Sequence, residues 1–319
     1  MEKIAALFPG QGSQYVGMNR DLREQFPWTK AIYEEASEAI KTNLNRLCLD
    51  GPADTLQLTQ NAQPAILTTS YAWYRVVQKA LGLTPANAAG HSLGEYSALL
   101  ASGAMTLSEA VLLVRTRGQL MQEAVPVGQG KMAALLGLDD DQVRTACQLA
   151  SEKNRIVVPA NFNAPSQVVV AGHAVAVDRL ISLCSGEKPE LKARKAIALN
   201  VSAPFHCPLM KPVADAFSQH LSKVVWAKRL FPVANNLDGI LRSEGDLIAL
   251  LRDQIDHPVL WTACARALAD AGSRWFVEMG PGKVLTGLVK RIVDGARLSS
   301  LDSFEDFTNL EKLYQEHAT

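Results

Sequence analysis

The sequence predicts an α/β protein with a parallel sheet, interrupted in the middle of the chain by a smaller unit. In the first and last thirds of the 319 residues, short apolar runs alternate with helical patterns, which is typical of a parallel sheet covered by helices. The middle of the chain changes to closely spaced strands joined by short turns. The run "GHSLG" (90–94) has the form Gly-x-Ser-x-Gly and stands between an apolar strand and a helical pattern.

The first third contains two expected strands and four expected helices. The run "KIAALF" (3–8) is a buried strand that ends at Pro9-Gly10, because this pair interrupts regular structure. The second strand, "ANAAG" (86–90), has small side chains, as a central strand needs where a helix packs closely on it. The helices are expected at about 29–42, at about 62–82, from about residue 93, and at about 107–124.

The middle third predicts a ferredoxin-like unit. The strand "KMAALLGL" (131–138) is followed by Asp139-Asp140-Asp141, which cap a helix to about 153. Two strands, a helix and a last strand follow at 155–162, 167–172, about 174–184 and 195–200. The order β-α-β-β-α-β is that of a ferredoxin-like unit. We therefore expect a ferredoxin-like inserted subdomain at 127–198.

The last third returns to alternation of strands and helices. The expected strands are 231–235 and 274–279, and the expected helices lie at about 208–224, 246–255 and 258–271. Residues 1–126 and 199–319 therefore form one large catalytic domain with a parallel sheet.

Charge and cysteine content exclude several classes of protein. Thirty-two basic and 32 acidic residues balance, so no overall charge draws the chain to nucleic acid or to an anionic membrane. Five cysteines without a C-x-x-C pair fit neither a disulfide framework nor a zinc site. No apolar run suits a signal peptide or approaches the roughly 20 residues of a membrane span. We expect a cytoplasmic protein without a metal ion.

Ser92 is the candidate nucleophile. In a strand-turn-helix setting, Gly-x-Ser-x-Gly forms the nucleophile elbow of α/β-hydrolase-like folds, where a sharp turn exposes the serine Oγ. The Leu93 N–H at the helix start can then face a developing oxyanion. The pattern is short enough to arise by chance, and the alternative is a serine that caps a helix between two glycines.

A serine needs a base, and His206 is the best placed of six histidines. It stands in "VSAPFHCPLM" between Pro204 and Pro208, which stiffen the backbone and discourage a helix. The alternative is a partly buried loop histidine bonded to a carbonyl. The other five have structural explanations: His91 supports the elbow, His173 ends a strand, His257 begins a helix, and His220 and His317 lie in polar helical stretches.

Seven motifs together resemble the malonyl-CoA:acyl carrier protein transacylases, the stand-alone enzymes that load malonyl groups in bacterial fatty-acid synthesis. The resemblance covers nearly the whole chain, in order. The motifs are "FPGQGSQ" (8–14), "TQNAQPA" (59–65), "GHSLGEYSAL" (90–99), "RTRGQLMQ" (115–122), "ANFNAPSQVVVAG" (160–172), "SAPFHCPLM" (202–210) and "GPGKVLTGL" (280–288).

The resemblance implies a role for each catalytic residue. Ser92 is acylated, and His206 is the base. Gln11 and Leu93 supply the backbone N–H groups of the oxyanion hole. Gln254 supplies a main-chain carbonyl that orients the histidine.

The resemblance also implies the substrate site. Arg117 pairs with the free carboxylate of malonate, whereas helical periodicity alone does not choose between Arg115 and Arg117, which flank the apolar stripe about equally. Phe205 crowds the substituents at C2 of the acyl group. The other implied substrate-binding residues are Gln63, Met121 and Asn163.

The implied reaction transfers malonyl from coenzyme A to the phosphopantetheine thiol of acyl carrier protein. We expect a monomer that needs no cofactor of its own, since the coenzyme A thioester is a substrate and the acceptor protein carries the phosphopantetheine. An acidic carrier would dock on a local basic surface, for which the candidates are Lys192, Arg194 and Lys195, or Lys283, Lys290 and Arg291. The gap between the large domain and the insert is expected to shield the malonyl ester from water.

Three other functions fit the sequence less well. A serine hydrolase of the α/β-hydrolase type needs an acid between the serine and the histidine, and the aspartates there are Asp139 to Asp141 and Asp178, which all look structural. A dinucleotide site fails because Tyr15 stands at the third glycine position of "GQGSQYVG". A non-enzymatic docking module would lack the elbow, the base or the carboxylate clamp. Here all three are expected.

Overall fold

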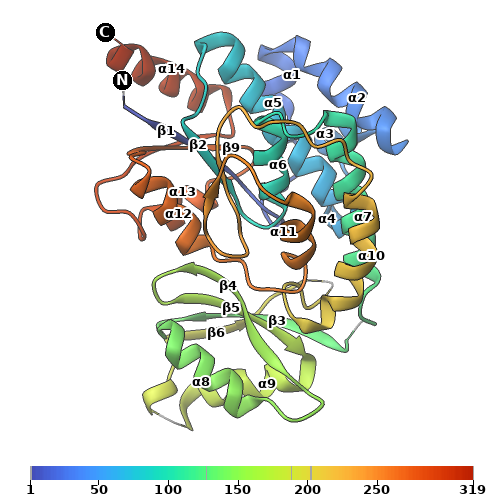
Figure 1. Cartoon of the computed structure of the whole chain (residues 1–319), viewed down its shortest axis with the longest axis vertical. Helices are drawn as coiled ribbons and strands as arrows, with labels where there is room; N and C mark the ends of the chain where they lie inside the picture. Colours follow the sequence, from blue (N-terminus) through green and yellow to red (C-terminus); the bar gives the residue numbers. More distant parts are fainter. Residues whose placement is uncertain (1, 127, 188, 202, 319) are drawn as a thin grey trace.

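The computed structural model, which describes residues 2–126, 128–187, 189–201 and 203–318, has a mixed α/β architecture (Figure 1). One sheet of six strands, here called the large sheet, has the order β10-β9-β1-β2-β7-β8. Its neighbouring strands run parallel except β7 with β8. The expected α/β class with a parallel sheet is confirmed. The strands are β1 (Ile4–Phe8), β2 (Asn87–Gly90), β7 (Val233–Ala234), β8 (Leu241–Arg242), β9 (Trp275–Met279) and β10 (Arg297–Leu301).

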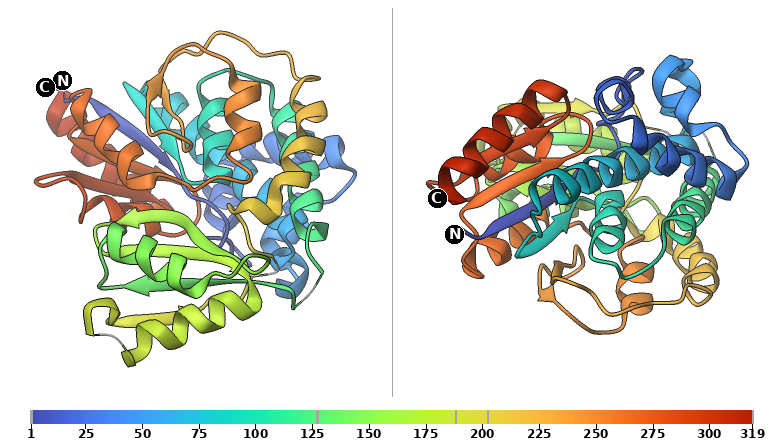
Figure 2. Two further views of the ribbon diagram at one scale, coloured as in Figure 1. Left: turned by 60° about the horizontal axis from the view of Figure 1, so that its bottom comes forward. Right: turned by 90° about the horizontal axis from the view of Figure 1, so that it is seen from above.

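Helices cover both faces of the large sheet because its strands are apolar on both sides. All five residues of β1 are buried. Ile4, Ala6 and Phe8 belong to the core that includes α5 (Thr59–Leu81) and α7 (Leu107–Glu123), and the Phe8 ring meets the Tyr74 ring of α5 edge-on. Ala5 and Leu7 point the other way, to α12 (Trp261–Asp270) and α13 (Val284–Val289). Figure 2 shows these helical layers from two further directions.

The remaining helices outside the small antiparallel sheet pack around the large sheet. The expected helices at 29–42, from 93, at 208–224 and at 246–255 are present as shorter segments, whereas the sequence did not predict α1, α3, α4, α13, α14, β8 or β10. Several of these elements are too short for a periodic pattern to stand out. The helices not yet named are α1 (Arg20–Gln25), α2 (Lys30–Ile40), α3 (Leu44–Asp50), α4 (Ala53–Gln57), α6 (Leu93–Ala101), α10 (Lys211–Leu221), α11 (Leu247–Asp253) and α14 (Phe304–Ala318).

A second, antiparallel sheet lies below the large one in Figure 1, with its two helices on the far side. We call it, with those helices, the small unit. Its strand order is β4-β5-β3-β6, which is compatible with a ferredoxin-like fold. Its elements are β3 (Gly130–Leu136), α8 (Asp140–Ala150), β4 (Val157–Ala164), β5 (Gln167–His173), α9 (Ala174–Ser182) and β6 (Lys195–Ala198). The expected insert boundaries at 127 and 198 stay a prediction, and residues 1, 127 and 319 lie outside the described residues.

The small unit shares its sheet between two cores. Ala133, Leu135 and Val168 pack against α8 and α9, whereas Met132 and Val169 face the core of the large sheet. Because the side chains of a strand alternate between its faces, one sheet serves both cores. The two parts of the molecule therefore pack through a buried apolar layer.

Backbone bonds also join the two parts. Phe162 of β4 donates its N–H to the carbonyl of Val259 at 2.9 Å, and Val259 donates to the carbonyl of Ala160 at 2.9 Å. These two bonds extend the pairing of β4 into the segment before α12.

No helix in the described part of the chain is long and apolar enough to cross a membrane. The same residues contain no cluster of three or more His, Cys, Asp or Glu side chains arranged to hold a metal ion. All five cysteines are free and buried.

Candidate active site

The candidate site lies at the carboxyl ends of β1 and β2, where ligands bind in open parallel sheets. The segment Pro9 to Gln14 follows β1, and His91 and Ser92 follow β2. They line a cavity of about 810 Å³, whose other wall includes residues of β3, β4 and β5. The cavity therefore lies between the large sheet and the small unit.

Ser92 occupies a sharp turn between β2 and α6. Its φ of 53° lies in the left-handed region, which is uncommon for a residue other than glycine. The two glycines of the motif permit the close approach of strand and helix: a Cβ on Gly90 would lie 1.8 Å from the Gly94 backbone, and one on Gly94 would lie 2.0 Å from the Phe8 carbonyl oxygen. This geometry is that of a nucleophile elbow.

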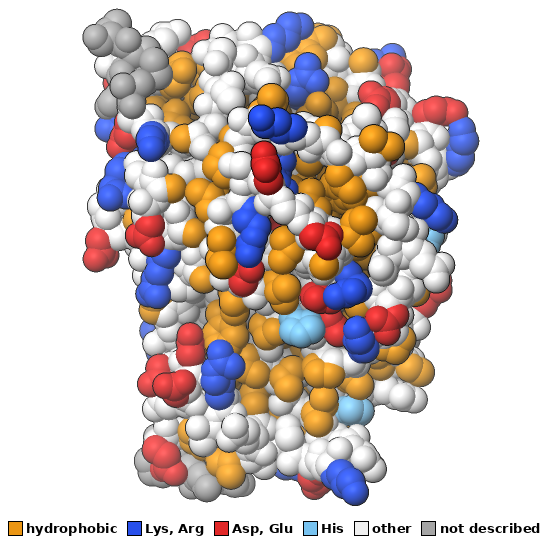
Figure 3. Space-filling view, in the orientation of Figure 1, with side chains coloured by type: hydrophobic (Ala, Val, Ile, Leu, Met, Phe, Trp, Pro, Cys, Tyr) orange, Lys and Arg blue, Asp and Glu red, His pale blue; other side chains and the backbone are white. Residues whose placement is uncertain are grey.

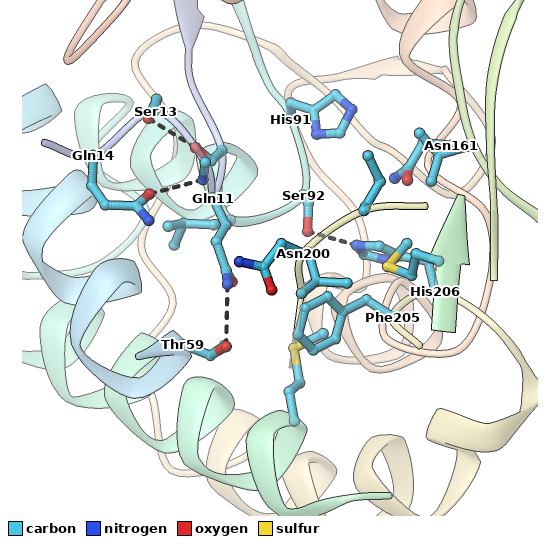
Figure 4. A pocket seen from close by; sticks show the side chains of 18 of the residues that line it. Gln11, Ser13, Gln14, Thr59, His91, Ser92, Asn161, Asn200, Phe205 and His206 are labelled. Atoms are coloured by element: carbon cyan, nitrogen blue, oxygen red, sulfur yellow. Dashed lines mark hydrogen bonds between the residues drawn. The ribbon is translucent and has the colours of Figure 1, made fainter. Parts of the chain in front are cut away.

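His206 lies beside the serine. Its Nε2 is 2.7 Å from Ser92 Oγ, and Figure 4 shows the two side chains pointing toward each other. Its Nδ1 is 2.9 Å from the backbone carbonyl of Gln254. Because a carbonyl only accepts, Nδ1 carries the proton, and Nε2 is left to accept the serine O–H.

The His206 ring is only 4% exposed. Burial, together with the nearby positive charge of Arg117, lowers its pKa to about 3. The imidazole is therefore neutral near pH 7, as a base that takes a proton from serine must be.

Arg117 brings a positive charge into contact with the candidate nucleophile. Its Nη2 donates to Ser92 Oγ at 3.0 Å and to Gln254 Oε1 at 3.0 Å, and its Nη1 donates to Gln63 Oε1 at 2.9 Å. The guanidinium is 1% exposed and lies over the Tyr96 ring. Arg115, which periodicity left as an equal alternative, points elsewhere and donates to the carbonyl of Gln60.

Two backbone N–H groups are available for an oxyanion. Gln11 and Leu93 both line the cavity, and among the described residues neither N–H has an acceptor. Leu93 is the first residue of α6, so its N–H also lies at the positive end of that helix. The Gln11 side chain turns toward Thr59 instead, with Nε2 to Oγ1 at 3.1 Å (Figure 4).

The other expected substrate residues surround this centre. Phe205 and Met121 are buried and line the cavity, and the Gln63 amide nitrogen contacts Met121 Sδ at 3.8 Å. Asn163, from β4, also lines the cavity, and His91 Nε2 lies 2.8 Å from its Oδ1. The structure thus brings all ten sequence-predicted site residues to one place.

The expected structural roles of the acids match the geometry. Asp139 accepts from the Gln142 N–H in a capping box at the start of α8, and Asp178 pairs with Lys131. Sequence reasoning, however, considered aspartates and overlooked Glu95, which is 1% exposed on the first turn of α6. Its carboxylate bonds to the Gln254 side chain, and among the described residues no carboxylate is bonded to His206.

Asn236 is a second residue that sequence reasoning missed. Its Oδ1 accepts the Ser92 N–H at 2.7 Å, and its Nδ2 donates to the Gly90 carbonyl at 2.8 Å. The amide therefore holds both ends of the elbow turn. Its only sequence signal is the pair "NN" (235–236) at the end of a predicted strand.

The two candidate basic patches for carrier docking differ in whether their charges already pair with acidic side chains. Lys192, Arg194 and Lys195 are exposed, whereas Lys283 pairs with Asp306 at 2.8 Å. Figure 3 shows charges of both signs interspersed over one face of the molecule. The choice of a docking surface stays a prediction.

Comparison with known proteins gives one consistent result. Residues 6–305 match the family described as "Acyl transferase domain". The malonyl CoA-acyl carrier protein transacylase of Escherichia coli strain K12 is 47% identical over 304 residues, which cover 95% of this chain and 96% of that protein.

Solved structures agree. A malonyl-CoA:acyl carrier protein transacylase from Xanthomonas oryzae superposes with a TM-score of 0.94 at 40% identity, covering 98% of each chain. One solved structure is a complex between a type II PKS acyl-carrier protein and its malonyl-transacylase. A chain of that complex superposes with a TM-score of 0.92 at 39% identity, covering 98% of this chain and 99% of that one.

Proposed function

The chain belongs to the acyl transferase domain family, and from this premise we propose that it transfers malonyl groups from malonyl-CoA to the phosphopantetheine thiol of acyl carrier protein. The reaction passes through a malonyl ester on Ser92 and supplies fatty-acid synthesis. The thioester brings the activated acyl group and the carrier brings the thiol, so this chain supplies binding, proton transfer and charge stabilisation.

In the first half-reaction Ser92 Oγ attacks the thioester carbonyl while His206 Nε2 takes its proton. The 2.7 Å contact between these atoms supports this role. The Gln11 and Leu93 N–H groups stabilise the tetrahedral oxyanion. When the C–S bond breaks, His206 returns the proton to the coenzyme A sulfur, and the malonyl ester remains.

In the second half-reaction the carrier thiol takes the place of coenzyme A. His206 accepts the thiol proton as the sulfur attacks the ester carbonyl, and it then returns the proton to Ser92 Oγ as the ester bond breaks. The products are malonyl-carrier and free enzyme, so ping-pong kinetics are expected.

The observation that carries the proposal is the contact between Arg117 and Ser92. A buried guanidinium 3.0 Å from the nucleophile suits an acyl group that ends in a carboxylate. An acetyl group would leave that buried cation without its anionic partner. The main alternative, a serine hydrolase, explains neither this cation nor a histidine oriented by a carbonyl.

The proposal is tested by mass spectrometry after incubation with malonyl-CoA. The wild type should gain one malonyl group and pass it to holo acyl carrier protein, whereas Ser92→Ala should gain none and lose at least about 10⁴-fold in transfer. Ser97→Ala, at a buried serine of the same helix, is the matched control and should transfer normally. A stable malonyl adduct on Ser92→Ala would contradict the assignment.

A further inference from the structure

Glu95 is a buried carboxylate that the proposed mechanism does not use. It lies on the first turn of α6, three residues after the nucleophile, and is 1% exposed. Its two oxygens accept hydrogen bonds from Asn235 Nδ2, from the Asn236 backbone N–H at 3.0 Å and from Gln254 Nε2 at 2.7 Å. The donors come from two segments more than 100 residues away in sequence.

A buried carboxylate is costly, so its three bonds need an explanation. Burial penalises an ionised group by several kcal/mol unless its oxygens are well bonded. A glutamate at this position of a helix commonly reaches back to the N-cap N–H. Here the Ser92 N–H donates to Asn236 instead, and the Glu95 side chain turns inward.

The first partner, Asn236, links Glu95 to the nucleophile. The carboxylate holds the Asn236 backbone N–H, and the Asn236 side chain holds the Ser92 N–H at 2.7 Å and the Gly90 carbonyl at 2.8 Å. Fixing this backbone thereby fixes the amide that clamps the elbow.

The second partner, Gln254, links Glu95 to both the base and the cation. An ionised carboxylate only accepts, so it requires that the Nε2 end of the Gln254 amide face it, and the Ser92 carbonyl accepts from the same Nε2 at 3.1 Å. The Oε1 end then faces Arg117 Nη2 at 3.0 Å, while the backbone carbonyl of the same residue accepts from His206. The orientation of this amide thus sets the direction of the guanidinium together with Gln63, whose Oε1 accepts from Nη1 at 2.9 Å.

We propose that Glu95 is a positioning residue for malonyl transfer, which fixes the Gln254 amide so that Arg117 presents its N–H groups to the acyl carboxylate beside Ser92. The inference rests on the proposed function, because it assigns a role within that reaction. Glu95 acts through Gln254 and Asn236. The inference predicts that the charge of Glu95 affects the preference for malonyl-CoA over acetyl-CoA as well as the rate of malonyl transfer.

The test compares Glu95→Gln with Glu278→Gln. Glutamine has one acceptor oxygen and one donor group, so it cannot accept from all three donors. Glu278 is the matched control, because it is fully buried and accepts three hydrogen bonds, all from Leu285 and Thr286. Both variants are checked by thermal unfolding, and kcat/KM is measured for malonyl-CoA and acetyl-CoA.

For Glu95→Gln we expect kcat/KM for malonyl-CoA to fall about 10- to 100-fold. The ratio of kcat/KM for malonyl-CoA to kcat/KM for acetyl-CoA should fall about tenfold, because only the carboxylate of the malonyl group depends on the direction of Arg117. For Glu278→Gln the preference should equal that of the wild type. A preference unchanged in Glu95→Gln, or narrowed equally in both variants, overturns the inference.

A second variant keeps the test decisive if Glu95→Gln does not fold. Gln254→Met removes the amide but leaves the backbone carbonyl that orients His206, so it should narrow the malonyl preference to a similar degree. If Gln254→Met keeps the wild-type preference, the inference is overturned. If the wild type itself fails to transfer malonyl, the proposed function falls and this inference falls with it.

Discussion

Ser92 and His206, which exchange the proton in the proposed mechanism, are both held in the left-handed region of backbone conformation. Their φ angles are 53° and 58°, a region that costs a residue other than glycine of order 1–3 kcal/mol. Asn236 bonds hold the serine turn, and flanking Pro204 and Pro208 restrict the chain around the histidine. These contacts hold both strained backbones in place, and Oγ and Nε2 lie 2.7 Å apart without substrate.

The pKa values at the site predict which group limits activity in acid. Burial and Arg117 lower the pKa of His206 to about 3, so the base stays neutral well below pH 7. Burial raises the pKa of Glu95 to about 7, against the opposing effect of its hydrogen bonds and of Arg117. As the pH falls through about 7, Glu95 becomes protonated and no longer accepts from all three donors.

We therefore expect the acid limb of kcat/KM for malonyl-CoA to have its midpoint near pH 7 in the wild type, and to shift to lower pH in Glu95→Gln. The measurement is a pH profile of acylation for both proteins. If the wild type and Glu95→Gln have identical acid limbs, a group other than Glu95 titrates near pH 7. The charged or titratable groups that interact with Glu95 are Tyr96 on the same helix and Arg117, Arg229, Arg242 and Cys264 on other elements.

At the scale of elements, the junction of β2 and α6 determines where the nucleophile lies. Gly90 and Gly94 let the strand, the helix and the end of β1 approach to within contact of each other's backbone. An added Cβ at Gly90 has no flexible side chain to displace, because its nearest neighbours are the backbone atoms of Gly94 and Glu95.

Gly90→Ala should therefore destabilise the fold by roughly 3 kcal/mol or more and reduce acylation, as measured by thermal unfolding and by malonyl incorporation. Gly287→Ala is the control. Gly287 lies in α13 with nothing within 4 Å of its added Cβ, so this change should be neutral or stabilise by about 0.5–1 kcal/mol. A tolerated Gly90→Ala would mean that the elbow has more room than the structure shows.

At the scale of the whole molecule, the cavity depends on how the small unit sits against the large sheet. Besides the backbone bonds around Val259, Arg291 follows α13 and donates to the Pro165 carbonyl at 2.6 Å and to the Gln167 side chain. Both acceptors lie at the turn between β4 and β5, and Gln167 lines the cavity. Arg291 thus ties that turn to the segment that follows α13.

We expect Arg291→Ala to shorten the hydrolysis half-life of the isolated malonyl-enzyme severalfold, because a loosened turn admits water to the ester. Lys290→Ala removes an equal charge from the neighbouring exposed residue, so it controls for the loss of charge itself. Equal half-lives for the two variants and the wild type would show that water is excluded by other contacts.

The sequence alone determined the features that depend on local chain geometry. A strand, a turn and a helix are consecutive, so "GHSLG" indicated the elbow and its serine without knowledge of the rest of the molecule. Prolines around His206 likewise predicted a stiff loop, and alternation of strands and helices predicted a parallel sheet. The motifs placed these residues in one enzyme family.

Only the tertiary structure decided which groups converge on Ser92 from distant segments. Periodicity gave Arg115 and Arg117 equal standing and only the family resemblance favoured Arg117, whose side of α7 the fold turns toward α5 and the elbow. The local sequence around Glu95 and Asn236 does not show their partners, since their bonds join residues more than 100 positions apart. A residue type or a spacing shows what a side chain can do, whereas its partners are fixed by packing between elements that the chain brings together only when it folds.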